Sequence, residues 1–160
     1  MRYFSKALTA LFILGSAVQA QAARPQSTGE YEHLRDRLLA GLPTVSIVDL
    51  SQCKMKDGKK PDALGPVGGL LIQDFMIMPE PHPSIGYSDN HMTVTPDGTP
   101  VLEVVQYRVM PDDTATVTAN RFLPRGYKRI SKPMVFDCQV GTALRFEPKE
   151  KSGIIPADNG

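Results

Sequence analysis

The sequence has no tryptophan, only two cysteines and three histidines, and almost no excess of charge of either sign. Its 18 Lys and Arg residues nearly balance its 17 Asp and Glu residues, which leaves a net charge of +1. The basic excess typical of nucleic-acid-binding proteins is therefore missing, and no nucleic acid is expected as a partner. The sequence likewise contains no cofactor signature, and we predict no cofactor.

Long apolar runs are also missing, apart from one near the N-terminus. That run spans residues 7–18, follows Arg2 and Lys6, and ends before the small-residue site at 20–22. A basic start, an apolar segment and a small-residue site are typical of a secretory signal peptide, here cleaved after Ala22. About 12 apolar residues fall short of the roughly 20 that a spanning helix needs, so no transmembrane anchor is expected.

Export predicts a periplasmic or secreted protein. Residues 1–22 are the expected signal, and 160 residues leave one domain over 23–160. Within it we expect a core at about 30–148 and a flexible tail at 149–160. Removing the signal takes two basic residues and no acidic one from the chain, so the mature protein stays close to neutral.

The two cysteines, Cys53 and Cys138, favour a disulfide because an exported chain with an even count meets oxidising conditions. The bridge would close a loop of about 85 residues, worth up to roughly 4 to 5 kcal/mol in the chain-entropy account. A catalytic thiol is the alternative, but neither cysteine belongs to a CxxC pair.

The hydrophobic pattern predicts one helix followed by strands. Apolar residues at helical spacing, with Thr28 as an N-cap and Gly41 and Pro43 as stops, place the helix at 30–40. Strands are expected at 44–50, 69–78, 88–95, 101–110, 114–123, 133–139 and 143–147. We predict an all-β antiparallel meander, curled into a small barrel or two-layer sandwich with the helix packed on it; α+β is the alternative.

Turn chemistry sets the expected register of the meander. Asp97-Gly98 as a two-residue loop places Met92 opposite Glu103, and a three-residue loop at 111–113 places Glu103 opposite Arg121. The resulting core face is apolar apart from the Glu103–Arg121 ion pair and comprises Met92, Val94, Val101, Val105, Tyr107, Val109, Ala115, Val117 and Ala119.

The same register gathers Asp89, His91, Gln106 and Arg108 on the opposite, solvent-facing side, where they form the predicted binding cluster. A hydrolase with Ser88 as nucleophile is an alternative, although adjacent strand residues project to opposite faces. A metal site of His82, Asp89 and His91 is another. A structural hydrogen-bonded network is the third, and we assign no catalytic residue and no metal ligand here.

Several fragments together resemble the VirK family of small exported bacterial proteins. They are Asp-Leu-Ser-Gln-Cys at 49–53, Gly-Gly at 68–69, Ser-Asp-Asn-His at 88–91, the strand at 100–109 and the second cysteine at 138. The resemblance covers about 34–147. It implies a periplasmic protein linked to virulence or host interaction, and it carries no catalytic residues over to this chain.

The favoured function is thus a non-enzymatic periplasmic or secreted binding or accessory protein, with an envelope or host protein as an unidentified partner. A small hydrolase or metal-dependent enzyme that uses Asp89 and His91 is the alternative. A carrier of small ligands is a third hypothesis, and it would need an open barrel lined by Met76, Met92 and Tyr107.

Overall fold

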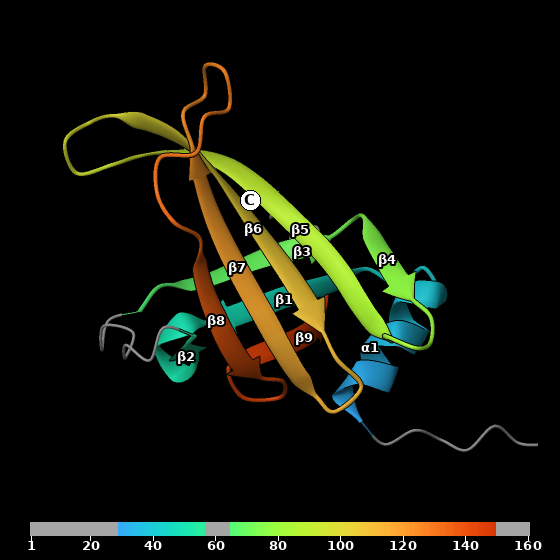
Figure 1. Cartoon of the computed structure of the whole chain (residues 1–160). Helices are drawn as coiled ribbons and strands as arrows, with labels where there is room; N and C mark the ends of the chain where they lie inside the picture. The colour runs from blue at the N-terminus through green and yellow to red at the C-terminus, as the bar shows by residue number, and fades with distance from the viewer. Residues whose placement is uncertain (1–28, 57–64, 150–160) are drawn as a thin grey trace, which may run out of the picture.

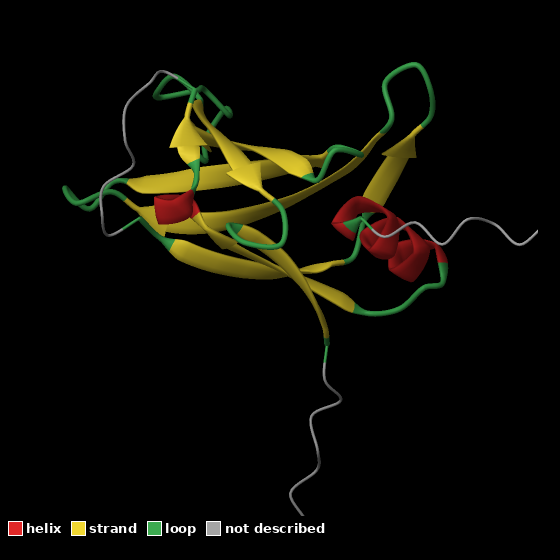
Figure 2. Ribbon diagram, turned by 90° about the horizontal axis from the view of Figure 1, so that it is seen from below, coloured by secondary structure: helices red, strands yellow, loops and turns green. Residues whose placement is uncertain are grey.

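The computed structural model of the protein describes residues 29–56 and 65–149. Two antiparallel sheets lie face to face with one helix at one end, as Figures 1 and 2 show. The all-β prediction is confirmed in its sandwich form, because the sheets do not close into a barrel. The signal predicted at 1–22, Thr28 and residues 150–160 of the predicted tail lie outside the described residues.

The larger sheet has the strand order β2-β8-β7-β6-β5-β4, and the smaller one has the order β3-β1-β9. In Figure 1 the long strands of the larger sheet run diagonally across the front, and the smaller sheet crosses behind them. The elements are α1 (Glu30–Leu39), β1 (Thr44–Asp49), the 3₁₀ turn η1 (Leu50–Gln52), β2 (Lys54–Met55), β3 (Val67–Ile72), β4 (Phe75–Met78), β5 (Ser84–Val94), β6 (Pro100–Val109), β7 (Thr114–Phe122), β8 (Met134–Gln139) and β9 (Leu144–Pro148).

Helix α1 buries Tyr31, Leu34 and Leu38, which recur every three or four residues and join the core. Its N-cap, Gly29, supplies no side-chain hydrogen bond. Instead, the amide of Tyr31 donates to Asp113 Oδ1 at 2.7 Å, from the loop between β6 and β7. A residue distant in sequence therefore satisfies one of the free amides of the first turn.

The helix ends as the sequence predicts, at a glycine in the left-handed region. Gly41 has φ of 67° and donates to the Leu38 carbonyl, while Leu42 donates to the Arg37 carbonyl. These two bonds form a Schellman motif, which needs a left-handed residue after the helix. The chain then enters β1 directly, which fixes how α1 packs against the sandwich.

The core lies between the two inner faces. Along β1, Thr44, Ser46 and Val48 are buried in alternation, as expected for a strand with one covered face. The Ser46 hydroxyl is hydrogen-bonded to the Tyr87 hydroxyl of β5 at 2.8 Å, and Tyr87 stacks on Tyr107 with ring centroids 4.7 Å apart. The hydroxyl contact joins the two sheets, whereas the aromatic stack lies within the larger sheet, between β5 and β6.

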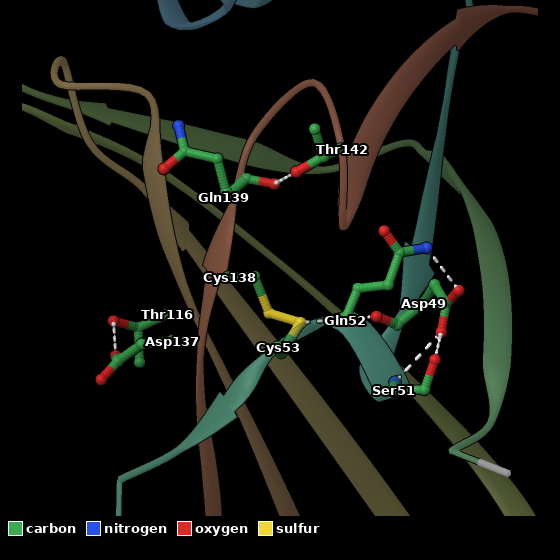
Figure 3. The surroundings of a disulfide bond; sticks show 9 residues. All are labelled: Asp49, Ser51, Gln52, Cys53, Thr116, Asp137, Cys138, Gln139 and Thr142. Carbon is green, nitrogen blue, oxygen red and sulfur yellow. Dashed lines mark hydrogen bonds between the residues drawn. A yellow bond between two sulfur atoms is a disulfide. The ribbon is translucent and has the colours of Figure 1, made fainter. Parts of the chain in front are cut away.

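The disulfide prediction is confirmed, because Cys53 and Cys138 are bonded (Figure 3). Asp49 ends β1 and caps η1: its carboxylate accepts hydrogen bonds from the Ser51 amide and from the Gln52 side chain. This short turn places Cys53 beside β8, where Cys138 lies. The Asp-Leu-Ser-Gln-Cys fragment is thus a capped turn that positions a cysteine.

One predicted strand is wrong in its extent. The run at 69–78 is two strands, β3 and β4, which belong to different sheets. The exposed pair Gln73 and Asp74 separates them, and at this point the chain crosses from one layer to the other. An apolar run alone does not show such a crossing, because both strands present apolar residues to the same core.

The predicted register of the β5–β6 hairpin is wrong by one residue. Met92 lies opposite Leu102, and His91 lies opposite Glu103. The cause is Pro96, which suits the second position of a turn from Thr95 to Gly98; the Gly98 amide donates to the Thr95 carbonyl at 2.8 Å. The loop therefore has three residues and ends on Gly98 at φ of 84°, instead of the two that Asp97-Gly98 predicts.

The slip moves every β5 side chain to the other face of the sheet. Met92 and Val94, predicted in the core, are 57% and 65% exposed. Ile85 and Tyr87 of β5 fill the core in their place. The β6–β7 register is the predicted one, with Glu103 opposite Arg121, and Val101, Tyr107, Val109, Ala115, Val117 and Ala119 are buried there.

Candidate functional site

A cleft of about 700 Å³ lies between the two sheets, and we name it the inter-sheet cleft. Its floor is the inner face of the larger sheet, with β2 at the edge, and the smaller sheet with η1 forms the opposite side. The walls are mainly apolar and include Val48, Leu50, Met55, Leu70, Val105, Val117, Met134 and Phe136. Clefts of this size with apolar walls are the usual form of small-molecule sites.

One side of the cleft carries a row of polar residues that follows from the β5–β6–β7 register. His91, Glu103 and Arg121 lie directly opposite one another on the three strands, and we call them the polar row. Arg121 Nε donates to Glu103 Oε1 at 2.9 Å, and His91 Nε2 lies 3.3 Å from Glu103 Oε2. Each oxygen of the carboxylate thus has its own nitrogen partner.

Burial within the row is uneven. The Glu103 side chain is only 15% exposed, whereas His91 and Arg121 are 50% and 40% exposed. A shielded carboxylate held between two nitrogen groups has a fixed orientation, because both partners constrain it. The outer edges of His91 and Arg121 remain open to a bound molecule, and the His91 contact becomes a full ion pair only when the imidazole is protonated.

Asp89 also lines the cleft, two residues from His91 on the same face of β5. It lies opposite Val105, next to Tyr107 along β6. Burial raises the pKa of Tyr107 to about 12, and the Asp89 carboxylate contributes to the increase. The phenol therefore stays protonated and can act as a neutral hydrogen-bond donor at the edge of the apolar wall.

The structure does not bring the predicted cluster together. Asp89 and His91 face the inter-sheet cleft, whereas Gln106 and Arg108 face outward on the other side of the sheet. The one-residue register shift at Pro96 causes this separation, because it moves only the β5 residues to the inner side. In the structure His91 therefore lies beside Glu103 and Arg121, and not beside Gln106 and Arg108.

Gln106 and Arg108 line a second hollow, on the outer face of the larger sheet. It has a volume of about 630 Å³, and Ser88, Met76 and Met78 also contribute to it. Met76 is 67% exposed. Of the three residues that the carrier hypothesis placed around one cavity, Tyr107 lines the inter-sheet cleft, Met76 lines the outer hollow, and Met92 faces outward.

The structure separates the residues that the hydrolase hypothesis grouped. Ser88 and His91 project to opposite faces of β5, so the hydroxyl cannot reach the imidazole. In the described ranges 29–56 and 65–149, no three His, Cys, Asp or Glu side chains are grouped closely enough to hold a metal ion. The polar row can accept and donate hydrogen bonds at the edge of an apolar cleft.

Sequence reasoning missed the wall contributed by the smaller sheet, above all Val48, Leu50 and Leu70. These residues meet β6 and β7 only through the packing of two sheets, which no local spacing encodes. One signal was present in Pro96: a proline directly before Asp97-Gly98 favours a three-residue loop and hence the inward placement of His91.

Comparison with known proteins identifies the relatives of this chain. The model of the family described as VirK protein matches residues 27–127, which is more than half of the chain. The chain belongs to the VirK family. This confirms the resemblance drawn from its sequence fragments.

Two curated relatives of this VirK-family chain resemble it over most of its length. Protein y4wH of Sinorhizobium fredii, named as uncharacterised, is 29% identical over 137 residues, which cover 85% of this chain and 92% of the relative. An uncharacterised protein from the pinF2 3′ region of Rhizobium radiobacter is 27% identical over 146 residues, covering 91% and 97%. The likeness extends across nearly the whole of both proteins.

A crystal structure of a VirK family protein from Legionella pneumophila has the same fold. It superposes with a TM-score of 0.64 at 15% identity, over 74% of this chain and 96% of that one. At this identity the match concerns the fold alone. In the described part of the present chain, no helix has the length and apolar character required to cross a membrane.

Proposed function

We propose that this VirK-family protein is a non-enzymatic, exported binding protein whose inter-sheet cleft holds a small, largely apolar molecule with one polar group. One observation carries the proposal: a cleft of about 700 Å³ combines apolar walls with a fixed polar row along one side. The apolar walls would supply affinity, and the polar row would orient the ligand.

Export and a role in virulence or host interaction belong to the same proposal. The bonded cysteines suit an oxidising compartment, the periplasm or the exterior, and the N-terminal pattern suits a cleaved signal followed by one domain from residue 23. The link to virulence follows from what the family resemblance implies. An envelope or host protein then receives or senses the ligand-loaded protein.

The experiment is a fluorescence titration with the neutral dye Nile red, using Leu70→Trp and Leu71→Trp as a matched pair. Both leucines are half-buried on β3, but Leu70 lines the cleft opposite Ser46, and Leu71 lies on the other face. We expect Leu70→Trp to weaken dye binding at least about 10-fold, because filling the cleft removes the apolar contact area. Leu71→Trp should bind as the unsubstituted protein does.

Two results would overturn the proposal. One is dye binding that both variants leave unchanged, which would place the dye on another surface such as the outer hollow. The other is the absence of dye binding by the folded, unsubstituted protein. If Leu70→Trp does not fold, Gly68→Leu replaces it, because a side chain at Gly68 faces the same cleft and meets no atom within 4 Å.

A further inference from the structure

The loop between β7 and β8 gathers positive charge. Residues 123–133 contain Arg125, Lys128, Arg129 and Lys132 and no acidic residue, in a chain whose total net charge is only +1. All four side chains are exposed. Figure 1 shows this segment as the orange loop that projects beyond the end of β7, away from α1.

The loop has a defined backbone. The Leu123 amide donates to the Lys128 carbonyl at 2.8 Å, and the Ile130 amide donates to the Arg121 carbonyl at 3.0 Å. At its tip, Gly126 and Tyr127 both have positive φ, 78° and 51°. The charges are therefore presented on an ordered hairpin-like loop that holds them at one end of the molecule.

Exposed apolar side chains accompany these charges. Tyr127 at the tip is 70% exposed, and Ile130 is 41% exposed. Burial within this chain explains neither of them. A tyrosine beside Lys and Arg is typical of the interface between water and a bilayer, where the ring enters the headgroup layer and the hydroxyl stays hydrated.

The outer face of the larger sheet continues this apolar surface. Met92, Leu102 and Phe122 lie opposite one another on β5, β6 and β7, and the Arg129 guanidinium lies 5.6 Å above the Phe122 ring. Met92 and its neighbour Val94 are the β5 side chains that the register places outside. The basic loop thus borders an apolar row in which Met92 is exposed and Leu102 and Phe122 are half-buried.

Acidic groups do not cancel this charge. Asp97, in the neighbouring β5–β6 turn, accepts hydrogen bonds from its own turn residues Thr95 and Thr99. Glu103 faces the inter-sheet cleft and pairs with Arg121. Among the residues that the structure describes, this end of the molecule therefore carries the four exposed cations of loop 123–133 beside the turn carboxylate of Asp97.

We propose that this end of the protein docks on the surface of a bilayer that contains anionic phospholipid. The four cations of loop 123–133 attract the headgroups, and Tyr127, Ile130 and the apolar row enter the interfacial layer. An acidic protein surface would satisfy the charges, but it would leave the exposed tyrosine and the apolar row without a matching environment.

The test measures co-sedimentation of the protein with lipid vesicles. The protein is purified after the producing cell has processed its N-terminus. Phosphatidylcholine vesicles with and without phosphatidylglycerol are compared at low and high salt. We expect binding only when phosphatidylglycerol is present, and weaker binding at high salt. Arg125→Glu with Lys128→Glu should lower partitioning at least about 25-fold, since each cation near an anionic surface contributes about fivefold.

The matched control is Arg145→Glu with Lys149→Glu, which changes the net charge equally but on the exposed residues of β9 and its end. This pair should retain vesicle binding, and Tyr127→Ser should weaken it. Equal losses in both double variants would reduce the effect to bulk charge and overturn the proposal. Absence of vesicle binding would also overturn the proposal. So would binding to polyglutamate that is as tight as binding to the vesicles and that Tyr127→Ser leaves unchanged.

Discussion

Tyr87 is the residue on which the two sheets depend most directly. Its hydroxyl is bonded to Ser46 of the opposite sheet, and its ring stacks on Tyr107 and meets the edge of Phe146 at 6.5 Å between centroids. Burial raises the pKa of this phenol far above its ordinary value of 10.0. The folded protein therefore keeps the Tyr87 proton under conditions in which the unfolded chain releases it.

This difference predicts alkaline unfolding with a definite sign. Above a pH of about 10 the unfolded state binds fewer protons than the folded state, so the free energy of unfolding falls by about 1.4 kcal/mol per pH unit. Below that pH the contribution of Tyr87 is fully present. We measure the free energy of unfolding by urea denaturation at several pH values across this range, and we expect it to fall less steeply with pH for Tyr87→Phe. At neutral pH the same variant should lose about 1 kcal/mol, because Ser46 loses its partner.

Tyr127 supplies the control for this experiment, because its side chain is 70% exposed and its ring joins no sheet contact described here. In Tyr127→Phe the free energy of unfolding should fall with pH as steeply as in the unsubstituted protein and should have the same value at neutral pH. An identical slope in Tyr87→Phe would contradict the assignment and would point to Tyr31 or Tyr107, whose pKa values burial also raises.

At the scale of elements, α1 depends on a residue outside itself. Asp113 accepts the Tyr31 amide, and its negative charge lies at the positive end of the helix dipole. Asp113→Gly should cost about 1 kcal/mol in urea denaturation, because the cap is lost while glycine accepts the φ of 58° at this position. Asp113→Asn keeps an acceptor oxygen and tolerates the same φ, so it should cost less.

The comparison of the two variants isolates the cap from the backbone. Equal stability of Asp113→Gly and the unsubstituted protein would show that the bond to Tyr31 contributes nothing.

The cap also shows how far the sequence alone predicts this element. The apolar residues at helical spacing and Gly41 identified α1 and its end, but the partner of its first turn is 82 residues away from Tyr31 and belongs to a loop.

Strand pairing divides in the same way between local and distant causes. The β6–β7 register was predictable because residues 111–113 fix the loop length, and it places Glu103 beside Arg121. The β5–β6 register was mispredicted because Asp97-Gly98 by itself predicts a two-residue loop, whereas Pro96 extends the loop to three residues. That single residue decides whether His91 faces solvent or the inter-sheet cleft. The other wall of the cleft arises only when the two sheets pack, so no spacing in the sequence foretells it.

At the scale of the whole molecule, the Cys53–Cys138 disulfide fixes the point where the chain passes from β1 of the smaller sheet to β2 of the larger sheet. Cys53 lies at this crossing, and the bond ties it to β8 of the larger sheet. The layers contact each other mainly through side chains, since hydrogen-bonded strand pairs lie within each sheet. The bond spans a sequence separation of 85 residues, so it restricts the unfolded chain strongly. The two-layer arrangement, and with it the inter-sheet cleft, should therefore depend on oxidation.

Replacing both cysteines with serine should lower the free energy of unfolding by as much as about 4 to 5 kcal/mol, the figure the chain-entropy account gives for a loop of this length. The measurement is urea denaturation of the variant beside the oxidised and the chemically reduced protein. The reduced protein and the double variant should agree, because both lack only the covalent link. Nile red binding should fall in parallel with the folded fraction. A loss below about 1 kcal/mol would mean that side-chain packing alone holds the layers together, and export into an oxidising compartment would then not be needed for the fold.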